Sequence, residues 1–213
     1  NKFQAMTQDQ QNAILEDQIK RALSYRKNDS TAAPLLIVTP ETFTGDIIVG
    51  QYERSRTWRR FTTFLADYPN VNMLFGASSY DYITSEKAPS HTARHIKDDL
   101  WVESHNSALM IDGSTRTDIF HKSRLVVAVE KTPYPAIVCR IEDLLGGVMG
   151  RCIGQGNVSL LHANTGNGSI PLGCAVCYES VFGEYYTDYI RKGARAMTII
   201  TNDAWWGNTP GYK

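Results

Sequence analysis

The stretch PLGCAVCYESVFGEYYTDYIRKGARAMTIITND, from Pro171 to Asp203, contains the pattern that decides the fold class. Its first residues, PLGCAVC, form an apolar run typical of a strand. The segment SVFGEYYTDYIRKGA predicts a helix, and AMTIITND predicts a second strand. Buried strands separated by a helix are typical of α/β proteins.

The N-terminal part of the chain repeats this order of helices and strands. Thr7 and Gln10 have the spacing of a capping box, and apolar residues then recur at helical spacing up to about Arg26. PLLIVTP, bounded by Pro34 and Pro40, predicts a fully buried strand. A second helix over about 54–66 and a second buried strand, VNMLFGAS, follow.

The middle of the chain predicts antiparallel strands. A surface excursion is predicted for the polar segment SEKAPSHTARHIKDD. A strand, a turn and a second strand are then predicted for SALMID, DGST and TDIFHKSRLV, in that order. Residues 133–168 are irregular, with short strands expected at AIVCRI and NVSLLHA. Helices and strands together predict an α/β layered sandwich with a mixed sheet in a single domain over residues 1–213.

Composition excludes several classes of function. The 22 basic residues balance the 22 acidic ones, so net charge does not recruit nucleic acid or an anionic membrane. The sequence contains no run of about 18 apolar residues, so it predicts no membrane span. The first residues are too polar for a signal peptide. Four cysteines are too sparse for a disulfide scaffold, although a single bridge stays open.

The pair Cys174 and Cys177 has several possible roles: a disulfide, a redox pair, half of a metal site, or a nucleophile beside a bystander. In an extended strand the two would lie about 10 Å apart on opposite faces. That exceeds the Cα separation of roughly 7 Å that a disulfide spans. We therefore predict that Cys174 faces the core and that Cys177 ends the strand, where a helix N-terminus would lower the pKa of its thiol. The alternative is that both are buried small hydrophobic residues.

Glu41 and Lys122 also follow predicted strands. A thiol nucleophile needs a base, which a carboxylate can provide, and a tetrahedral oxyanion needs a fixed positive donor, which a lysine can provide. Glu41, Lys122 and Cys177 therefore form a complete set for acyl transfer. Each of the first two, taken singly, would more often be a solvated surface residue.

The segments PETF, HKSRLV, CYES and TNDAWWG carry these three residues and occur in this order between Pro40 and Gly207. Together they resemble the Glu-Lys-Cys signature of the nitrilase, or carbon-nitrogen hydrolase, superfamily. Within it they are most similar to the apolipoprotein N-acyltransferase family. The resemblance implies an α-β-β-α sandwich with mixed sheets, incomplete at both ends and lacking the membrane helices that flank this domain in that family.

Finer features carry the resemblance to the acyltransferases. They imply supporting or substrate-binding roles for six residues: Glu130, Tyr178, Glu179, Asn106, Trp205 and Trp206. Glu130 follows the lysine at the spacing of that family's second glutamate, and Asn106 matches its Tyr-Asn-Ser asparagine. The segment LVVAVEKTPY departs from the family's Leu-Val-Pro-Phe-Gly-Glu, so a differently shaped loop is expected around Glu130.

The resemblance implies a two-step reaction without a metal or cofactor. A phospholipid donates an acyl chain to Cys177 as a thioester, and the N-terminal amine of an S-diacylglyceryl-cysteine lipoprotein then accepts it. The implied location is the bacterial inner membrane, with the catalytic domain on its periplasmic face. The acyl-binding surface is expected at Trp205 and Trp206, or at LLGGVM around 144–149.

Two rival interpretations use the same residues. A soluble amidase or nitrilase would resolve the thioester with water, and an inactive superfamily member would serve as a binding module. His91 and His95 have helical spacing but no third ligand, so no metal site is predicted there.

Overall fold

A computed structural model describes residues 6–26, 33–127, 129–144 and 151–202. The described residues form four α-helices, nine strands and two 3₁₀ helices. In chain order these are α1 (Gln8–Arg26), β1 (Leu35–Val38), β2 (Thr44–Ile48), η1 (Tyr52–Arg54), α2 (Arg56–Leu65), β3 (Val71–Thr84), β4 (Arg94–Lys97), β5 (Leu100–Ile111), β6 (Thr117–His121), α3 (Pro135–Leu144), β7 (Leu161–Asn164), β8 (Ser169–Val176), η2 (Cys177–Val181), α4 (Gly183–Arg191) and β9 (Ala196–Ile200).

The larger sheet has six strands arranged around two long ones, β3 and β5, which pair antiparallel along their whole length. On the outer side of β3, β1 and β2 pair in parallel with successive parts of the strand. On the outer side of β5, β4 and β6 pair antiparallel. The sheet is therefore mixed, and its short edge strands end partway along the long ones.

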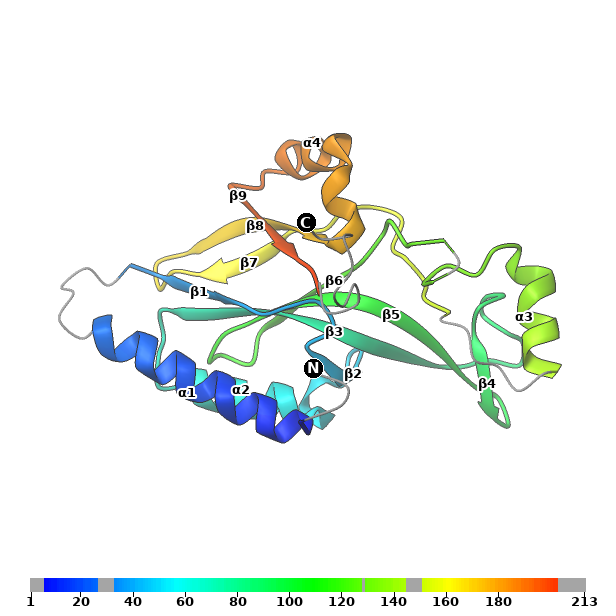
Figure 1. The fold of residues 1–213 in the computed structure, drawn as a ribbon, viewed down its shortest axis with the longest axis horizontal. Coiled ribbons are helices and arrows are strands. Elements are labelled where there is room, and N and C mark those ends of the chain that lie inside the picture. Colours follow the sequence, from blue (N-terminus) through cyan, green and yellow to red (C-terminus); the bar gives the residue numbers. More distant parts are fainter. Residues whose placement is uncertain (1–5, 27–32, 128, 145–150, 203–213) are drawn as a thin grey trace.

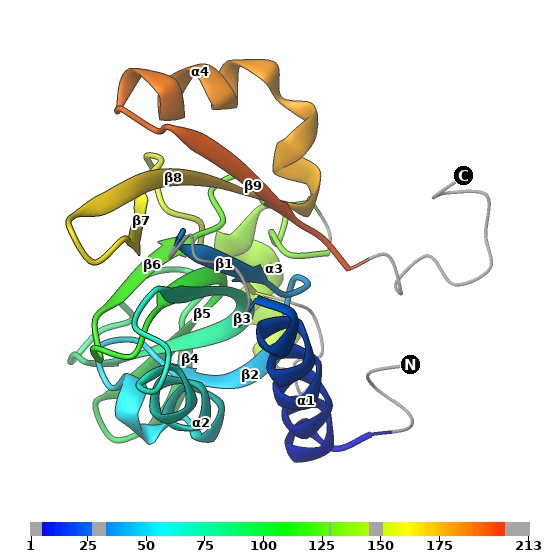
Figure 2. The same cartoon turned by 90° about the vertical axis from the view of Figure 1, so that its left-hand side faces the viewer.

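The smaller sheet contains β7, β8 and β9, with β8 in the centre, antiparallel to β7 and parallel to β9. Figure 1 shows this sheet stacked on the larger one, with α4 above it and α1 and α2 below the larger sheet. Figure 2 shows the same four layers from the side. The architecture is an α-β-β-α sandwich, as predicted, and α3 lies apart at the end that carries β4.

Two hydrophobic cores hold the layers together. One lies between the two sheets and under α4, and includes Met110, Phe120, Cys174 and Tyr189. The other lies between the larger sheet and the helices α1 and α2, and includes Phe61 and Leu109, among others. Because side chains alternate across a strand, β5 contributes Met110 to one core and Leu109 to the other.

Most of the expected elements are confirmed, and three are corrected. AIVCRI, expected as a strand, lies in the helix α3, because Pro135 occupies the first helical position that proline favours. PLLIVTP is a strand but is not fully buried, since β1 is an edge strand and the side chain of Val38 is 45% exposed. The polar excursion contains the short strand β4, which pairs with β5.

Among the helices that the structure describes, none combines the length and the apolar character that crossing a membrane requires.

Candidate active site

Glu41 lies in the turn after β1, where the chain passes close over β3. Its side chain is buried, at 5% exposure. Gly76 of β3 makes this approach possible: a Cβ atom there would lie 2.5 Å from the carbonyl oxygen of Pro40 and 2.6 Å from the Cα of Glu41. The backbone amide of Glu41 donates to the carbonyl oxygen of Thr201, 3.3 Å away, which follows β9 in the smaller sheet. The carboxylate is thus fixed where the two sheets meet.

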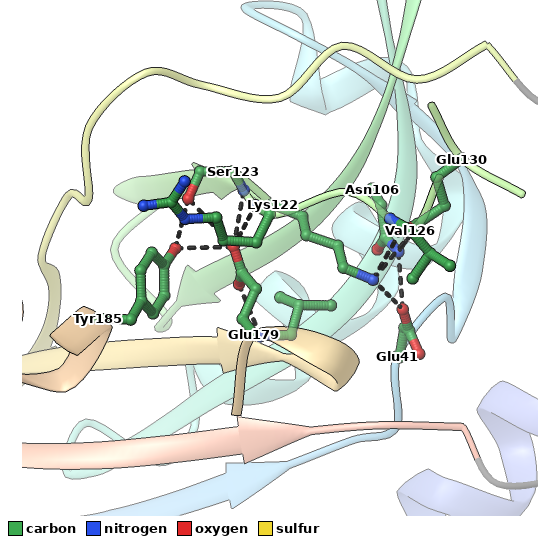
Figure 3. A network of polar contacts seen from close by, with 10 residues as sticks. Glu41, Asn106, Lys122, Ser123, Val126, Glu130, Glu179 and Tyr185 are labelled. Atoms are coloured by element: carbon green, nitrogen blue, oxygen red, sulfur yellow. Dashed lines mark hydrogen bonds and ion pairs between the residues drawn. The ribbon is translucent and has the colours of Figure 1, made fainter. Parts of the chain in front are cut away.

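Lys122 and Asn106 both contact the carboxylates of Glu41 and Glu130 (Figure 3). Lys122 follows β6, and its ammonium group lies 3.4 Å from Glu41 Oε1 and 2.9 Å from Glu130 Oε2. The side-chain amide of Asn106, on β5, donates to Oε1 of both glutamates at 2.7 Å. These donors fix the orientation of the asparagine, because a flipped amide would point its oxygen at two carboxylates.

The charge of Lys122 is held by its neighbours. Its side chain is 1% exposed, and this burial by itself would lower the pKa of the ammonium group. The nearby carboxylates of Glu41 and Glu130 act in the opposite direction, and the pKa of Lys122 is raised above its ordinary value. A buried cation that stays protonated is a fixed donor, which is what a developing oxyanion requires.

Glu130 lies in a loop whose backbone folds back on the carboxylate. The backbone amide of Val126 donates to Glu130 Oε2 at 2.9 Å, and the backbone amide of Cys152 donates to the carbonyl oxygen of Glu130 at 2.8 Å. The glutamate therefore points inward to Lys122 rather than outward to the neighbouring Lys131. Its pairing is not that of an ordinary surface residue.

Cys177 is the first residue after β8 and has a backbone conformation that is unusual for its type. Its φ is 53°, in the left-handed region that non-glycine residues rarely occupy, whereas Cys174 lies in the strand and is fully buried. Such backbone conformations cost about 1–3 kcal/mol and cluster at functional sites. The thiol of Cys177 is partly exposed, so the strand end presents it to solvent.

The pKa of Cys177 is shifted in the direction opposite to the one predicted. Burial and the charge of Glu41 raise it, and they outweigh the hydrogen bond with Thr201, the charge of Lys122 and the backbone amide of Tyr178, which act to lower it. The expected lowering by a helix N-terminus is therefore wrong. The thiol stays protonated at neutral pH, so a base must remove its proton during the reaction.

Glu179 connects the cysteine to the lysine. It is fully buried in η2, and its Oε2 accepts a hydrogen bond from the backbone amide of Val176 at 2.8 Å. Its Oε1 accepts from the backbone amides of Ser123 and Arg124, at 2.7 and 3.0 Å, and from the hydroxyl of Tyr185 at 2.7 Å. Figure 3 shows this second cluster beside the first, at the other end of the Lys122 side chain.

Tyr178, the residue after Cys177, lines a largely apolar groove. The groove has a volume of about 510 Å³, and its lining includes Tyr178, Phe182, Val127 and Ile153. The rings of Tyr178 and Phe182 stack edge to face, with centroids 5.1 Å apart. Tyr178 is 48% exposed and Val127 is 64% exposed, so apolar surface is open to solvent beside the site.

Some predicted site residues lie outside the described part of the chain. Trp205, Trp206 and residues 145–149 are among them. His95 lies on the exposed strand β4, where its ring packs against Trp101. Among the described residues, no group of three histidine, cysteine or acidic side chains could hold a metal ion.

The sequence analysis missed four residues that position the site: Gly76, Ser123, Tyr185 and Thr201. Ser123 is adjacent to Lys122 within the motif HKSRLV, which was the one available signal. The other three are defined only by contacts between segments far apart in the chain.

Comparison with curated proteins finds relatives named apolipoprotein N-acyltransferase. The protein of that name from Rhizobium leguminosarum bv. trifolii is 30% identical over 208 residues, which are 94% of this chain and 34% of that protein. The one from Chlorobaculum tepidum is 28% identical over 109 residues, 49% of this chain and 20% of that protein. The chain thus spans between a fifth and about a third of the length of these relatives.

Comparison with solved structures finds the same fold in nitrilase-superfamily proteins. Nit3 of Saccharomyces cerevisiae, a member of branch 10 of the nitrilase superfamily, superposes with a TM-score of 0.55 at 16% identity, covering 92% of this chain and 60% of that one. An amidase from Nesterenkonia sp. gives a TM-score of 0.52 at 15% identity, covering 95% of this chain and 64% of that one. The model of the carbon-nitrogen hydrolase family matches residues 5–213, and the chain therefore belongs to this family.

Proposed function

We propose that the chain is the catalytic domain of an apolipoprotein N-acyltransferase, with Cys177 as nucleophile, Glu41 as general base and Lys122 as oxyanion donor. The observation that carries the proposal is the buried Lys122 ammonium held between Glu41 and Glu130. A cation with two carboxylate partners keeps its charge and position without help from substrate, so it is preorganised for a negative charge that develops later.

In the first step, Glu41 removes the proton of the Cys177 thiol and the sulfur attacks the ester carbonyl of a phospholipid. The carbonyl oxygen becomes an oxyanion, which Lys122 and a backbone amide stabilise. The C–O bond then breaks, and the proton held by Glu41 passes to the leaving oxygen, which departs as lysophospholipid. A thioester remains on Cys177.

In the second step, the α-amine of an S-diacylglyceryl cysteine attacks the thioester carbonyl. Glu41 takes a proton from the amine, the C–S bond breaks, and the sulfur of Cys177 regains a proton. The product is an amide at the lipoprotein N-terminus. Because the pKa of Cys177 is raised, its thiolate is a poor leaving group, so the proton that Glu41 takes from the amine passes to the sulfur as the C–S bond breaks.

The remaining residues have supporting roles in this proposal. Asn106 and Glu130 orient Glu41 and Lys122 through the hydrogen bonds described above, and Glu179 positions the loop that carries Lys122. Tyr178 opens onto the apolar groove, which receives the acyl chain. An apolar, shielded surface also protects a thioester that has to wait for a second bulky substrate.

The name of the curated relatives, apolipoprotein N-acyltransferase, supports an acyl transfer to a lipoprotein amine. We propose that residues 1–213 form one carbon-nitrogen hydrolase domain, held at the bacterial inner membrane by membrane helices outside this segment and acting on the periplasmic face. Its partners are then a phospholipid donor and a lipoprotein acceptor. No metal or cofactor enters either step.

Intact-protein mass spectrometry tests the proposal. We expect incubation with phospholipid alone, without an amine acceptor, to give a long-lived adduct of fatty-acyl mass on Cys177. Adding a diacylglyceryl-cysteine peptide should discharge it and yield acylated peptide. Cys177→Ala should give no adduct, whereas Cys174→Ala should keep the chemistry and lose about 1 kcal/mol of stability.

The alternative is a soluble amidase that hydrolyses a carbon-nitrogen bond with the same residues. The fold that the chain shares with the Nesterenkonia amidase is compatible with this alternative. It predicts rapid release of free fatty acid, or adducts from small amides alone, and either outcome would overturn the transferase. An inactive binding module predicts no adduct from any acyl donor.

A further inference from the structure

Two cavities share part of their lining, including the two residues that follow Lys122. One is the apolar groove next to Tyr178, of about 510 Å³, and the other is a polar cavity of about 620 Å³. Ser123, Arg124 and Gly154 line both of them. The two cavities therefore share a wall, and a ligand that crosses this wall can occupy both.

The lining of the two cavities differs in chemistry. Apart from the shared residues, the groove is lined mainly by apolar side chains, among them Val127, Pro135, Tyr178 and Phe182, with Lys131 as its one further charged residue. The polar cavity contains the side chains of Arg191 and Lys192, from the end of α4, and of Asp188. Together with Arg124 from the shared wall, the lining of the polar cavity has three cationic side chains and one anionic side chain.

We propose that the polar cavity binds the phosphodiester group of the acyl donor while its acyl chain lies in the groove. This inference rests on the proposed function, because it uses the ester position at Cys177, and it adds a site for the headgroup. Arg124 lies between the two cavities and contacts the phosphate from the shared wall, while Arg191 and Lys192 contact it from the far side.

The donors in the cavity suit a phosphate. Arginine offers a planar fork of N–H groups that matches phosphate oxygens, and lysine offers a compact charge with three N–H donors. The carbonyl oxygen of Val158 accepts one donor of Lys192, at 2.5 Å. Asp188 pairs with Arg191 at 3.4 Å and does not cancel the excess of positive charge. The backbone amide of Arg124 donates a hydrogen bond to Oε1 of Glu179, and this contact anchors Arg124 in the loop that follows Lys122.

A phosphate site here gives the enzyme a way to distinguish its two lipid substrates. Donor and acceptor both carry acyl chains, so an apolar groove alone accepts either. The donor has a negatively charged phosphodiester, whereas the acceptor has a positively charged amine in its place. A cationic cavity attracts the first and repels the second, so the free enzyme binds the donor before the acceptor.

The first experiment measures how fast Cys177 is acylated by two donors with the same acyl chains in detergent micelles, phosphatidylglycerol and the uncharged diacylglycerol. We expect the double variant Arg191→Gln/Lys192→Gln, which changes side chains of the polar cavity only, to slow acylation by phosphatidylglycerol about tenfold, the loss of roughly one charged hydrogen bond. Acylation by diacylglycerol should stay unchanged. Arg59→Gln, an exposed cation on α2, is the matched control and should affect neither rate. Equal slowing with both donors would overturn the phosphate site.

The second experiment does not depend on catalysis. In calorimetric titrations, the Cys177→Ala protein should bind sn-glycerol 3-phosphate, and adding Arg124→Gln should weaken this binding about tenfold. Inorganic phosphate binding as tightly would assign the cavity to free phosphate rather than a lipid headgroup, and absence of binding by either ligand would overturn the site. Should wild type give no adduct from any donor, the proposed function fails, and the titration alone decides the anion site.

Discussion

Oε1 of Glu179 accepts the backbone amide hydrogen of Ser123 at 2.7 Å, which bonds the residue two positions after the candidate nucleophile to the residue directly after the candidate oxyanion donor. Glu179 belongs to η2, which follows β8 of the smaller sheet, and Ser123 belongs to the segment that follows β6 of the larger one. This buried carboxylate therefore contributes to the relative placement of Cys177 and Lys122. This contact gives Glu179, for which the CYES segment implied only a supporting role, a definite structural one.

Replacing Glu179 by glutamine should separate positioning from chemistry. All five groups that bond this carboxylate are donors, so an amide NH₂ group in its place would face donors and leave at least one of them unsatisfied. We expect a loss of about 2 kcal/mol in the free energy of unfolding and slower acylation of Cys177. Urea denaturation and intact mass measure the two effects. Glu184→Gln, exposed on α4, is the control, and equal behaviour of the two variants would refute the role of Glu179.

The reactivity of Cys177 should depend on Glu41 in two opposite ways. Burial and the Glu41 charge raise the pKa of the thiol, so its alkylation by iodoacetamide should have a midpoint above the ordinary thiol value. Glu41→Gln removes the charge and should shift this midpoint to lower pH, while it abolishes acyl transfer because the base is gone. Mass spectrometry after labelling across a pH series measures the midpoint. A midpoint that Glu41→Gln leaves unmoved would show that the two side chains do not interact.

Gly76→Ala should displace Glu41 with little effect on the rest of the fold. The new Cβ would lie 2.5 Å from the carbonyl oxygen of Pro40, and because that contact is with backbone, the turn carrying Glu41 must shift. We expect a stability loss of about 1–3 kcal/mol and a larger relative loss of acylation rate. Gly45→Ala is the matched control in β2, where an added Cβ meets no atom within 4 Å. Full acylation by Gly76→Ala would mean that the turn adapts without moving the carboxylate.

Acid should destabilise the fold through His121. This histidine packs against His105 with ring centroids 4.1 Å apart, and burial together with His105 lowers its pKa to about 4. The unfolded chain, with an ordinary histidine pKa of about 6.5, binds a proton first. The stability that the neutral ring contributes is therefore present above about pH 6.5 and is lost as the pH falls through about 4.

Urea denaturation at pH 7 and pH 5 measures this effect. His121→Gln should be less stable than wild type at pH 7, and its stability should fall less between the two pH values. His91→Gln, at an exposed position, should follow the wild-type curve. A wild-type decline that His121→Gln leaves unchanged would assign the acid sensitivity to other groups.

The sequence predicted the fold well because its periodicities are strong. Apolar runs bounded by proline and glycine mark β1 and β8, and the capping box at Thr7 marks the start of α1, where the side chain of Gln10 accepts from the Thr7 amide at 2.8 Å. The helix α3 was mistaken for a strand because AIVCRI is short and rich in residues that favour strands. Short apolar runs of this kind do not distinguish the two structures.

The site was predicted less completely, and for a physical reason. Candidate reactive residues such as Glu41, Lys122 and Cys177 can be recognised in the sequence by their residue type. The residues that position them can be recognised only from contacts in the folded structure. The direction of the Cys177 pKa shift illustrates the difference. A helix that begins after the strand is visible in sequence, but the burial and the Glu41 charge that raise the pKa of Cys177 arise only when the two sheets pack together.

The division of the site between two sheets has a consequence for partial unfolding of the protein. Glu41, Asn106 and Lys122 lie on the larger sheet, and Cys177 ends the central strand of the smaller one. A loosened state that keeps both sheets but loses their fixed packing retains its far-ultraviolet dichroism, yet it no longer holds a nucleophile opposite a base. Mild acid or heat should therefore abolish the proposed acylation of Cys177 while the secondary structure is still intact, and recovery should need only that the two sheets pack together again.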